Sequence, residues 1–350
     1  MESLIKAWEG ETVIVQYDRP TGAWIFIAIY STRLGPAAGG TRMKAYPEVR
    51  QALLDGMRLA KGMAYKYAVP DMPWGGGKAV IALPHDFAEH SRPGLLHRYG
   101  KLIHQLGGLF STGPDVGTCS EDMDVIAETG APHVFACTPD AGGSGSSGPY
   151  TALGVFTGIQ AACEHLFGED SLSGRKVLVQ GTGGVGGPLI DRLLEAGAEV
   201  AFNEIDEAAI LRCRDELGLR FIRSEDVFET PCDIFAPCAL GGLFNETSIP
   251  RLKCRIVAGG ANNQLAAPED AERLRARGIL YAPDYVINVG GAMAILGMET
   301  LAWGSDRAER EVVGSVRQAL HQVFELAERE AFSTGLAAGR IAEERLTADR

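Results

Sequence analysis

Apolar positions in the first part of the chain follow two different periods. Residues 12–17 alternate between apolar and polar, and residues 23–30 form a β-branched and aromatic run, so both predict strands. Residues 48–66 carry apolar side chains at helical spacing, and residues 78–83 return to a strand pattern. Residues 93–106 begin with a proline and are followed by two glycines, which indicates a second helix. We therefore expect a mixed α/β domain here.

The middle of the chain alternates strand and helix patterns. A helical segment at 150–167 leads into an apolar strand at 176–180. Further strands are expected at 199–203, 232–236 and 255–258. Because strands separated by helices pair in parallel, this part predicts a parallel sheet in a second α/β domain. Beyond it the composition becomes strongly helical.

Residues 138–149 show the clearest change of composition, because glycine and serine dominate them. Such a segment suits a hinge between two domains. It equally suits a loop whose glycines let the backbone approach a ligand. The sequence leaves both interpretations open.

Charge and cysteine content narrow the possible partners. Acidic residues outnumber basic residues by 45 to 33, which disfavours nucleic acid and anionic membranes as partners. No apolar run is long enough to span a bilayer, and no signal peptide is visible near the N-terminus. The seven cysteines have no metal-binding spacing, so we expect reduced thiols, no metal and a cytoplasmic location.

A GxGxxG sequence joins the strand at 176–180 to a helix. Its residues are Gly181, Thr182, Gly183, Gly184, Val185 and Gly186. In this context the first glycine makes a tight turn, the second lets a pyrophosphate reach the backbone, and the third lets helix and strand pack. The next strand ends at Glu204, where a carboxylate binds the adenosine ribose and repels the extra phosphate of NADP. The expected cofactor is NAD; the alternative is a glycine-rich turn without a ligand.

Two lysines and one aspartate are candidates for chemistry. Lys66 ends a predicted helix, where a lysine is usually a solvated charge. Lys78 follows three glycines, which clear space around a side chain or a ligand. Asp115 lies in a tight turn after a short strand, which is also an ordinary place for an aspartate. Taken singly, each residue is ambiguous.

Taken together, several motifs resemble one family. They are residues 35–43, 61–66, 75–78, 114–118, 237–241, 260–263 and 288–291. In order and spacing they are similar to the glutamate/leucine/phenylalanine/valine dehydrogenase superfamily, most of all to its leucine/phenylalanine branch. The resemblance covers roughly residues 10 to 330.

The resemblance implies a role for each candidate. Lys78 is the general acid/base that activates water for attack on an imino intermediate, and Asp115 exchanges a proton with the substrate amino group. Lys66 and Asn262 bind the substrate α-carboxylate. Further substrate contacts are expected from Gly40 and Met63, and nicotinamide contacts from Ala239, Asn262 and Asn288. The partners implied are an amino acid, its 2-oxo acid and ammonia, in a homo-oligomer.

This chemistry requires a particular environment. A lysine acts as a base near neutral pH only if its pKa falls, and burial together with the neighbouring Lys66 would lower it. Hydride transfer needs a dry cleft, which a hinge between two domains supplies. We expect a catalytic and oligomerisation domain at 1–140, a Rossmann-type NAD-binding domain at 141–325 and a helical segment at 326–350 that could pack back on the first domain.

Small residues at the expected substrate pocket indicate which side chain the substrate carries. Glutamate enzymes of this superfamily hold the substrate side chain with a lysine at the position of Ala38, so glutamate is disfavoured. Ala38 and Ala292 leave a wider pocket than leucine enzymes have, beside Ile295. We expect an aromatic substrate, with leucine or valine as the alternative. Residues 292–299 depart from the family pattern at the expected pocket wall.

A rival of a different class is a noncatalytic relative that binds nucleotide or amino acid as a sensor. A sensor has no need of a general base. The presence of Lys66, Lys78, Asp115 and Asn262 together therefore favours an enzyme.

Overall fold

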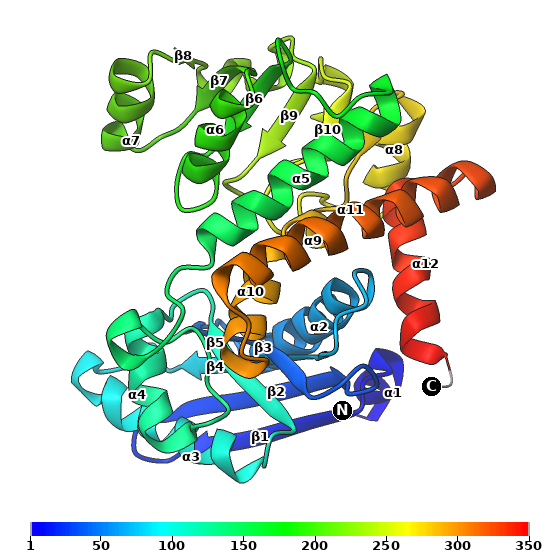
Figure 1. The fold of residues 1–350 in the computed structure, drawn as a ribbon. Helices are drawn as coiled ribbons and strands as arrows, with labels where there is room; N and C mark the ends of the chain where they lie inside the picture. Colours follow the sequence, from blue (N-terminus) through cyan, green and yellow to red (C-terminus); the bar gives the residue numbers. More distant parts are fainter. Residues whose placement is uncertain (1, 349–350) are drawn as a thin grey trace. The chain divides into compact units, whose positions relative to one another are not determined.

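The computed structural model describes residues 2–348, which divide into two compact units (Figure 1). Of these residues, unit 1 holds 2–146, 295–302 and 342–348, and unit 2 holds Ser147–Ala294 and Trp303–Ile341. Each unit has its own sheet. The prediction of a two-domain α/β fold is confirmed.

The sheet of unit 1 has five strands in the order β1-β2-β4-β3-β5. They are β1 (Thr12–Asp18), β2 (Ala23–Ser31), β3 (Ala37–Ala45), β4 (Gly75–Leu83) and β5 (Phe110–Pro114). β2 pairs antiparallel with β1 and β4, whereas β3 pairs parallel with β4 and β5. β3 was not expected as a strand, because its two adjacent glycines weaken the strand pattern.

Helices cover both faces of this sheet (Figure 1). The helices of unit 1 are α1 (Glu2–Trp8), α2 (Val49–Ala68), α3 (Arg92–Gln105) and α4 (Ser120–Gly130). One face packs against α2 through Phe26, Val80 and Ala82, and the opposite face packs against α3 and α4 through Ile27 and Ile81. Because side chains alternate along a strand, Lys78 shares the α2 face with Val80.

The glycines of β4 allow this close packing. A Cβ at Gly76 would lie 2.1 Å from the backbone nitrogen of Ala64 in α2, and a Cβ at Gly77 would lie 2.7 Å from the ring of Phe110. The glycines before Lys78 therefore let a helix and a neighbouring ring reach the strand. We expected them to clear space for a side chain or a ligand; the side chains that they admit include the ring of Phe110 at Gly77 and the Cβ of Ala64 at Gly76.

Unit 2 contains a six-stranded parallel sheet in the order β11-β10-β9-β6-β7-β8. The strands are β6 (Lys176–Gln180), β7 (Glu199–Asn203), β8 (Arg220–Phe221), β9 (Ile234–Pro237), β10 (Ile256–Val257) and β11 (Leu280–Tyr281). The chain reverses its direction of travel across the sheet between β6 and β9. This is the doubly wound arrangement, in which ligands bind beyond the carboxyl ends of the strands at the reversal.

The helices of unit 2 surround its sheet. They are α5 (Gly148–Phe167), α6 (Gly186–Glu195), α7 (Glu207–Leu211), α8 (Asp270–Ala276), α9 (Asp284–Ile287) and α11 (Ser305–Glu330). α11 lies along α5, as Figure 1 shows. Two more helices, α10 (Gly290–Thr300) and α12 (Thr334–Thr347), each contain a boundary between the units.

The boundaries differ from those expected at residues 140 and 325. The chain passes from unit 1 to unit 2 after Ser146, inside the glycine- and serine-rich segment. Residues 295–302 group with unit 1, because Glu299 binds backbone amides there. Of the helical segment expected at 326–350, only the part from Ala342 groups with unit 1.

Residues 2–348 contain neither a candidate membrane span nor a candidate metal cluster. Within that range, no helix has the length and apolar character needed to cross a bilayer. The same range contains no group of three or more His, Cys, Asp or Glu side chains placed to hold a metal ion.

The close packing of α2 on β4 gives a test of the fold. Gly76→Ala places a methyl group against the backbone of Ala64, and we expect it to destabilise the protein by about 3 kcal/mol. Gly62→Ala is the matched control, because Gly62 is exposed in α2 with nothing within 4 Å of the new atom. The control should raise stability by up to about 1 kcal/mol. Chemical denaturation measures both, and equal effects would contradict this packing.

Candidate active site

Lys78 and Asp115 form an ion pair on the α2 face of the unit 1 sheet. The Nζ atom of Lys78 lies 3.0 Å from Oδ1 of Asp115. Lys78 is only 5% exposed, although it is a lysine. The pair forms because β4 directs Lys78 to this face and Asp115 directly follows β5, two strands away in the sheet. The two expected catalytic residues are thus in direct contact.

Arg42 of β3 completes this pair. Its Nε atom donates a hydrogen bond of 2.8 Å to Oδ2 of Asp115, so each carboxylate oxygen of Asp115 has a cationic partner. Arg42 was not among the expected site residues, although it lies within the motif at 35–43. The sequence could have pointed to Arg42, because it lies two residues after Gly40 and both therefore share one face of a strand.

Burial and charge shift the pKa values of both members of the pair. Burial lowers the pKa of Lys78 below its ordinary value, although the charge of Asp115 raises it; Arg42 lowers it further. Burial raises the pKa of Asp115, but Lys78 and Arg42 outweigh that effect and keep it below the ordinary value. Asp115 is therefore ionised, and Lys78 releases its proton more readily than an exposed lysine.

Small residues let the strands of this site approach one another. A Cβ at Gly40 would lie 2.5 Å from the carbonyl oxygen of Pro114 and 2.9 Å from Cβ of Asp115. Ala38, two residues earlier in β3, is buried on the same face. Met63 and Lys66 are half-buried in α2 on either side of Ala64, the residue that covers Gly76. Unit 1 thus gathers its expected site residues on one sheet face and the helix above it.

A phenylalanine occupies part of this face. A Cβ at Gly113, which pairs with Gly40, would lie 2.2 Å from the ring of Phe135. The ring therefore fills the space that a larger residue at 113 would take. Phe135 was not among the expected site residues, because no sequence pattern connects it to β5.

Residues of α10 approach the same region of unit 1. Ile295 is buried, and Glu299 lies one turn later in the helix. The carboxylate of Glu299 accepts hydrogen bonds from the amides of Ala136 (2.8 Å) and Ser144 (2.7 Å). Ala136 has a left-handed backbone with φ of 58°. Glu299 therefore fixes the segment that carries Phe135, which gives a structural role to the stretch that departs from the family pattern.

In unit 2, the glycine-rich turn has the geometry expected for a pyrophosphate. Gly181 has a φ of 87°, and a Cβ at Gly186 would lie 1.9 Å from the carbonyl oxygen of Gly181. Nothing lies within 4 Å of a Cβ at Gly183 or Gly184. The turn is therefore tight at its ends and open in the middle, where backbone amides at the start of α6 can receive a phosphate. These residues fit NAD.

Glu204 is held beside this turn at the end of β7. One carboxylate oxygen accepts a hydrogen bond of 2.7 Å from the amide of Thr182, and the other accepts one of 2.7 Å from the amide of Ile205. Burial raises the pKa of Glu204, but these amides, with that of Asp206, outweigh it and lower the value. Glu204 therefore carries a fixed negative charge next to Thr182. In the same turn, the side chain of Val185 faces Gly260.

Three further expected residues lie near the reversal of the unit 2 sheet. Ala239 follows β9, and its Cα would lie 3.0 Å from a Cβ at Gly181. The side-chain amide of Asn288 donates a hydrogen bond of 2.9 Å to Oδ1 of Asn262, which follows β10. The buried Oδ1 atom of Asn288 has no hydrogen-bond partner among the described residues. The expected nicotinamide contacts thus gather on one side of the glycine-rich turn.

Two exposed apolar residues near this turn were not expected. Ile205, directly after Glu204, is 88% exposed, and Leu240, directly after Ala239, is 74% exposed. Both side chains present apolar surface next to the glycine-rich turn. Their signal in the sequence is only their position after two site residues.

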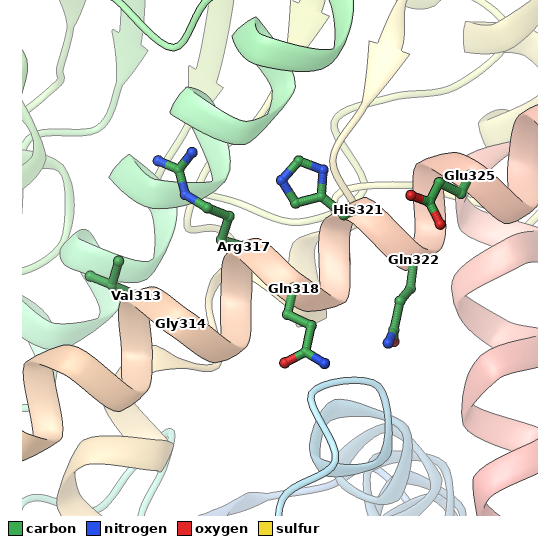
Figure 2. A pocket seen from close by; sticks show the side chains of 7 residues that line it. All are labelled: Val313, Gly314, Arg317, Gln318, His321, Gln322 and Glu325. Carbon is green, nitrogen blue, oxygen red and sulfur yellow. The ribbon is translucent and has the colours of Figure 1, made fainter.

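A surface pocket of about 400 Å³ lies elsewhere in unit 2, over α11. Figure 2 shows its lining side chains projecting from that single helix. One of them, Arg317, is paired with Glu164 of α5 at 2.8 Å. None of the expected site residues lines this pocket, so we assign it no catalytic role.

Comparison with known families gives matches over most of the chain. Residues 15–131 match the model described as "Glu/Leu/Phe/Val dehydrogenase, dimerisation domain". Residues 201–349 match the model described as "Glutamate/Leucine/Phenylalanine/Valine dehydrogenase".

Individual relatives carry several substrate names. The chain is 39% identical to a leucine dehydrogenase of Geobacillus stearothermophilus, covering 98% of this chain and 92% of that protein. It is 41% identical over 290 residues to a phenylalanine dehydrogenase of Lysinibacillus sphaericus, covering 81% and 75%. Among solved structures, an L-tryptophan dehydrogenase from Nostoc punctiforme matches with a TM-score of 0.86 and 34% identity, covering 99% and 98%.

The contacts of Glu299 can be tested by hydrogen exchange. Glu299→Ala removes the acceptor for two amides, and we expect exchange at Ala136 and Ser144 to accelerate by about tenfold or more. Glu299→Gln keeps one acceptor oxygen and should accelerate only one of the two amides. Glu309→Ala, an exposed glutamate of α11, is the control and should leave both unchanged. Unchanged exchange in Glu299→Ala would rule out this role.

Proposed function

This chain belongs to the Glu/Leu/Phe/Val dehydrogenase family, and on that premise we propose that it oxidatively deaminates an aromatic L-amino acid. It is an NAD-dependent amino acid dehydrogenase of the leucine/phenylalanine/valine type. The observation that carries the proposal is the buried contact of Lys78 with Asp115 on a sheet face lined by small residues.

Each residue has a defined task in the proposed reaction. Lys66 and Asn262 bind the substrate α-carboxylate, and Asp115 accepts a proton from the substrate amino group. NAD, when bound, would supply the acceptor for the hydride of the substrate α-carbon, and the oxidised substrate is then an imino acid. Neutral Lys78 takes a proton from water as the water adds to the imino carbon, and returns it as ammonia departs. The lowered pKa of Lys78 supports this role, because the neutral form must be populated.

The glycine-rich turn and its neighbours are proposed to hold the cofactor. The amides around Gly183 and Gly184 bind the pyrophosphate, and Glu204 binds the adenosine ribose hydroxyls. Ala239, Asn262 and Asn288 contact the nicotinamide. The exposed side chains of Ile205 and Leu240 support an adenine site, because an aromatic base would cover their apolar surface.

Two features support an aromatic substrate. One is the small side chain of Ala38 on the Lys78 face; Ala292 and Ile295 of α10 are further proposed substrate residues. The ring of Phe135 fills the space over Gly113, which puts an aromatic group on the same sheet face as Lys78. The L-tryptophan dehydrogenase among the similar structures is consistent with such a side chain.

A branched-chain substrate is the second candidate. It is favoured by the leucine dehydrogenase relative, which matches almost the whole chain at 39% identity. The match of residues 15–131 to a dimerisation domain supports a homo-oligomer, which we also propose. We further propose a cytoplasmic location, based on the absence of cysteine pairing among the described residues.

A panel of 2-oxo acids tests the substrate. NADH oxidation with ammonia is measured for phenylpyruvate, indolepyruvate and 4-methyl-2-oxopentanoate. We expect kcat/KM for one of the aromatic acids to exceed that of 4-methyl-2-oxopentanoate by about tenfold, a difference of about 1.4 kcal/mol in transition-state binding. A branched-chain preference would overturn the aromatic assignment.

The role of Lys78 as general acid/base is tested by substitution. Lys78→Ala should lower kcat by about 10³-fold and still bind NADH. Lys101→Ala changes an exposed lysine and is the control.

The role of Glu204 predicts a change of cofactor preference. Glu204→Gln removes the charge that repels the extra phosphate, so kcat/KM with NADPH should rise by about tenfold and that with NADH should fall. Glu207→Gln in the first turn of α7 makes the same charge change at an exposed position and should alter neither. An unchanged NADPH/NADH ratio in Glu204→Gln would show that this carboxylate does not face the ribose.

A further inference from the structure

Arg42 connects Asp115 to a second carboxylate. While its Nε atom contacts Asp115, its NH1 atom donates a hydrogen bond of 2.9 Å to Oδ2 of Asp55 in α2. Tyr46 donates a further hydrogen bond of 2.8 Å to the same oxygen, and Arg58 contacts the other oxygen of Asp55 at 2.9 Å. Arg42 thus bridges two carboxylates from two different elements.

This bridge leaves Arg42 little freedom. Its side chain is 16% exposed and those of Asp55 and Asp115 are 15% and 22% exposed, so all three are largely shielded from water. A planar guanidinium that bonds two fixed carboxylates through separate nitrogens has one orientation. Oδ2 of Asp115 is therefore committed to Arg42, and only Oδ1 is directed at Lys78.

We propose that Arg42 is a positioning residue for the deamination: it holds Asp115 so that one oxygen faces Lys78, and Asp55 anchors it for that task. The inference rests on the proposed roles of Lys78 and Asp115. Arg42 itself contacts neither the substrate nor the cofactor in this scheme. It acts through Asp115, which it orients and keeps ionised.

The charges around the site give this role a measurable signature. Asp115 contacts Lys78 directly, and Arg42 of β3 contacts Asp115. Around Arg42 lie Asp55 and Arg58 of α2, and Tyr46; Lys66 lies further along α2. The charge of Arg42 lowers the pKa of Lys78, and the charge of Asp55 raises it. Removing Arg42 therefore raises the pH at which Lys78 becomes neutral. Removing the charge of Asp55 lowers that pH.

The test compares the pH dependence of kcat/KM for oxidative deamination, using the full-length protein with NAD and phenylalanine or leucine, whichever it turns over faster. The rate rises with pH as Lys78 loses its proton, so the pH profile has a rising limb that reports the pKa of Lys78. In Arg42→Gln we expect this limb to move by about 0.5–1 unit to higher pH and kcat to fall by about 10²-fold. In Asp55→Asn the limb should move to lower pH by a smaller amount. Arg50→Gln, an exposed arginine of α2, is the control and should not move it.

Arg42→Lys separates charge from geometry. A lysine keeps the positive charge but lacks the fork that reaches both carboxylates, so the limb should return toward its original pH while kcat recovers only in part. If Arg42→Gln does not fold, Arg42→Lys and Asp55→Asn carry the test. A purely structural role would lower the stability of the variants and leave the limb of the folded protein in place.

The outcomes distinguish this inference from the proposed function. If Lys78→Ala abolishes turnover but the limb is unchanged in Arg42→Gln and Asp55→Asn, the positioning role fails and the catalytic assignment stands. If Lys78→Ala keeps full turnover, the catalytic assignment itself fails. If the limb moves in the same direction in Arg42→Gln and in Asp55→Asn, the role of Arg42 is also overturned.

Discussion

A lysine ammonium buried in a sheet face is costly unless a carboxylate neutralises it, and the rest of unit 1 is arranged around that requirement. Lys78 lies on a central strand, where burial favours its neutral form. Asp115 supplies the compensating charge from the end of β5, and Arg42 fixes that carboxylate from the strand between them. The result is a lysine whose pKa lies below that of an exposed lysine and whose charge Asp115 compensates.

Close backbone packing makes this arrangement possible. Gly76 lets α2 reach β4 at Ala64, and Gly40 lets Asp115 lie against β3. The same principle recurs in unit 2, where Gly186 packs on the carbonyl oxygen of Gly181. In each case the absence of a side chain on the glycine lets two segments of backbone pack closely beside an expected site residue. A methyl group at these positions would disturb the site through its framework before it met any ligand.

The sequence predicted the elements with the strongest periodicity and the motifs with a defined context. The strands at 176–180 and 199–203 have the expected bounds, because apolar runs between a turn and a helix are unambiguous. β3 was missed because Gly39 and Gly40 hide its pattern. Arg42 and Phe135 were missed because their roles depend on contacts between strands and loops far apart in the chain. Residues 75–77 were expected to clear space for a side chain or a ligand; in the structure Gly76 admits α2, and Gly77 admits the ring of Phe110.

Burial lowers the pKa of Lys78, and Asp115 limits the decrease. NMR titration of ¹³Cε-labelled lysine, with the Lys78 resonance assigned by Lys78→Arg, measures this directly. We predict a pKa below the ordinary value of 10.5 for Lys78, and a further decrease in Asp115→Asn, where burial acts without the compensating charge. A pKa of 10.5 or higher, or an increase in Asp115→Asn, would show that burial does not control the pKa of this lysine.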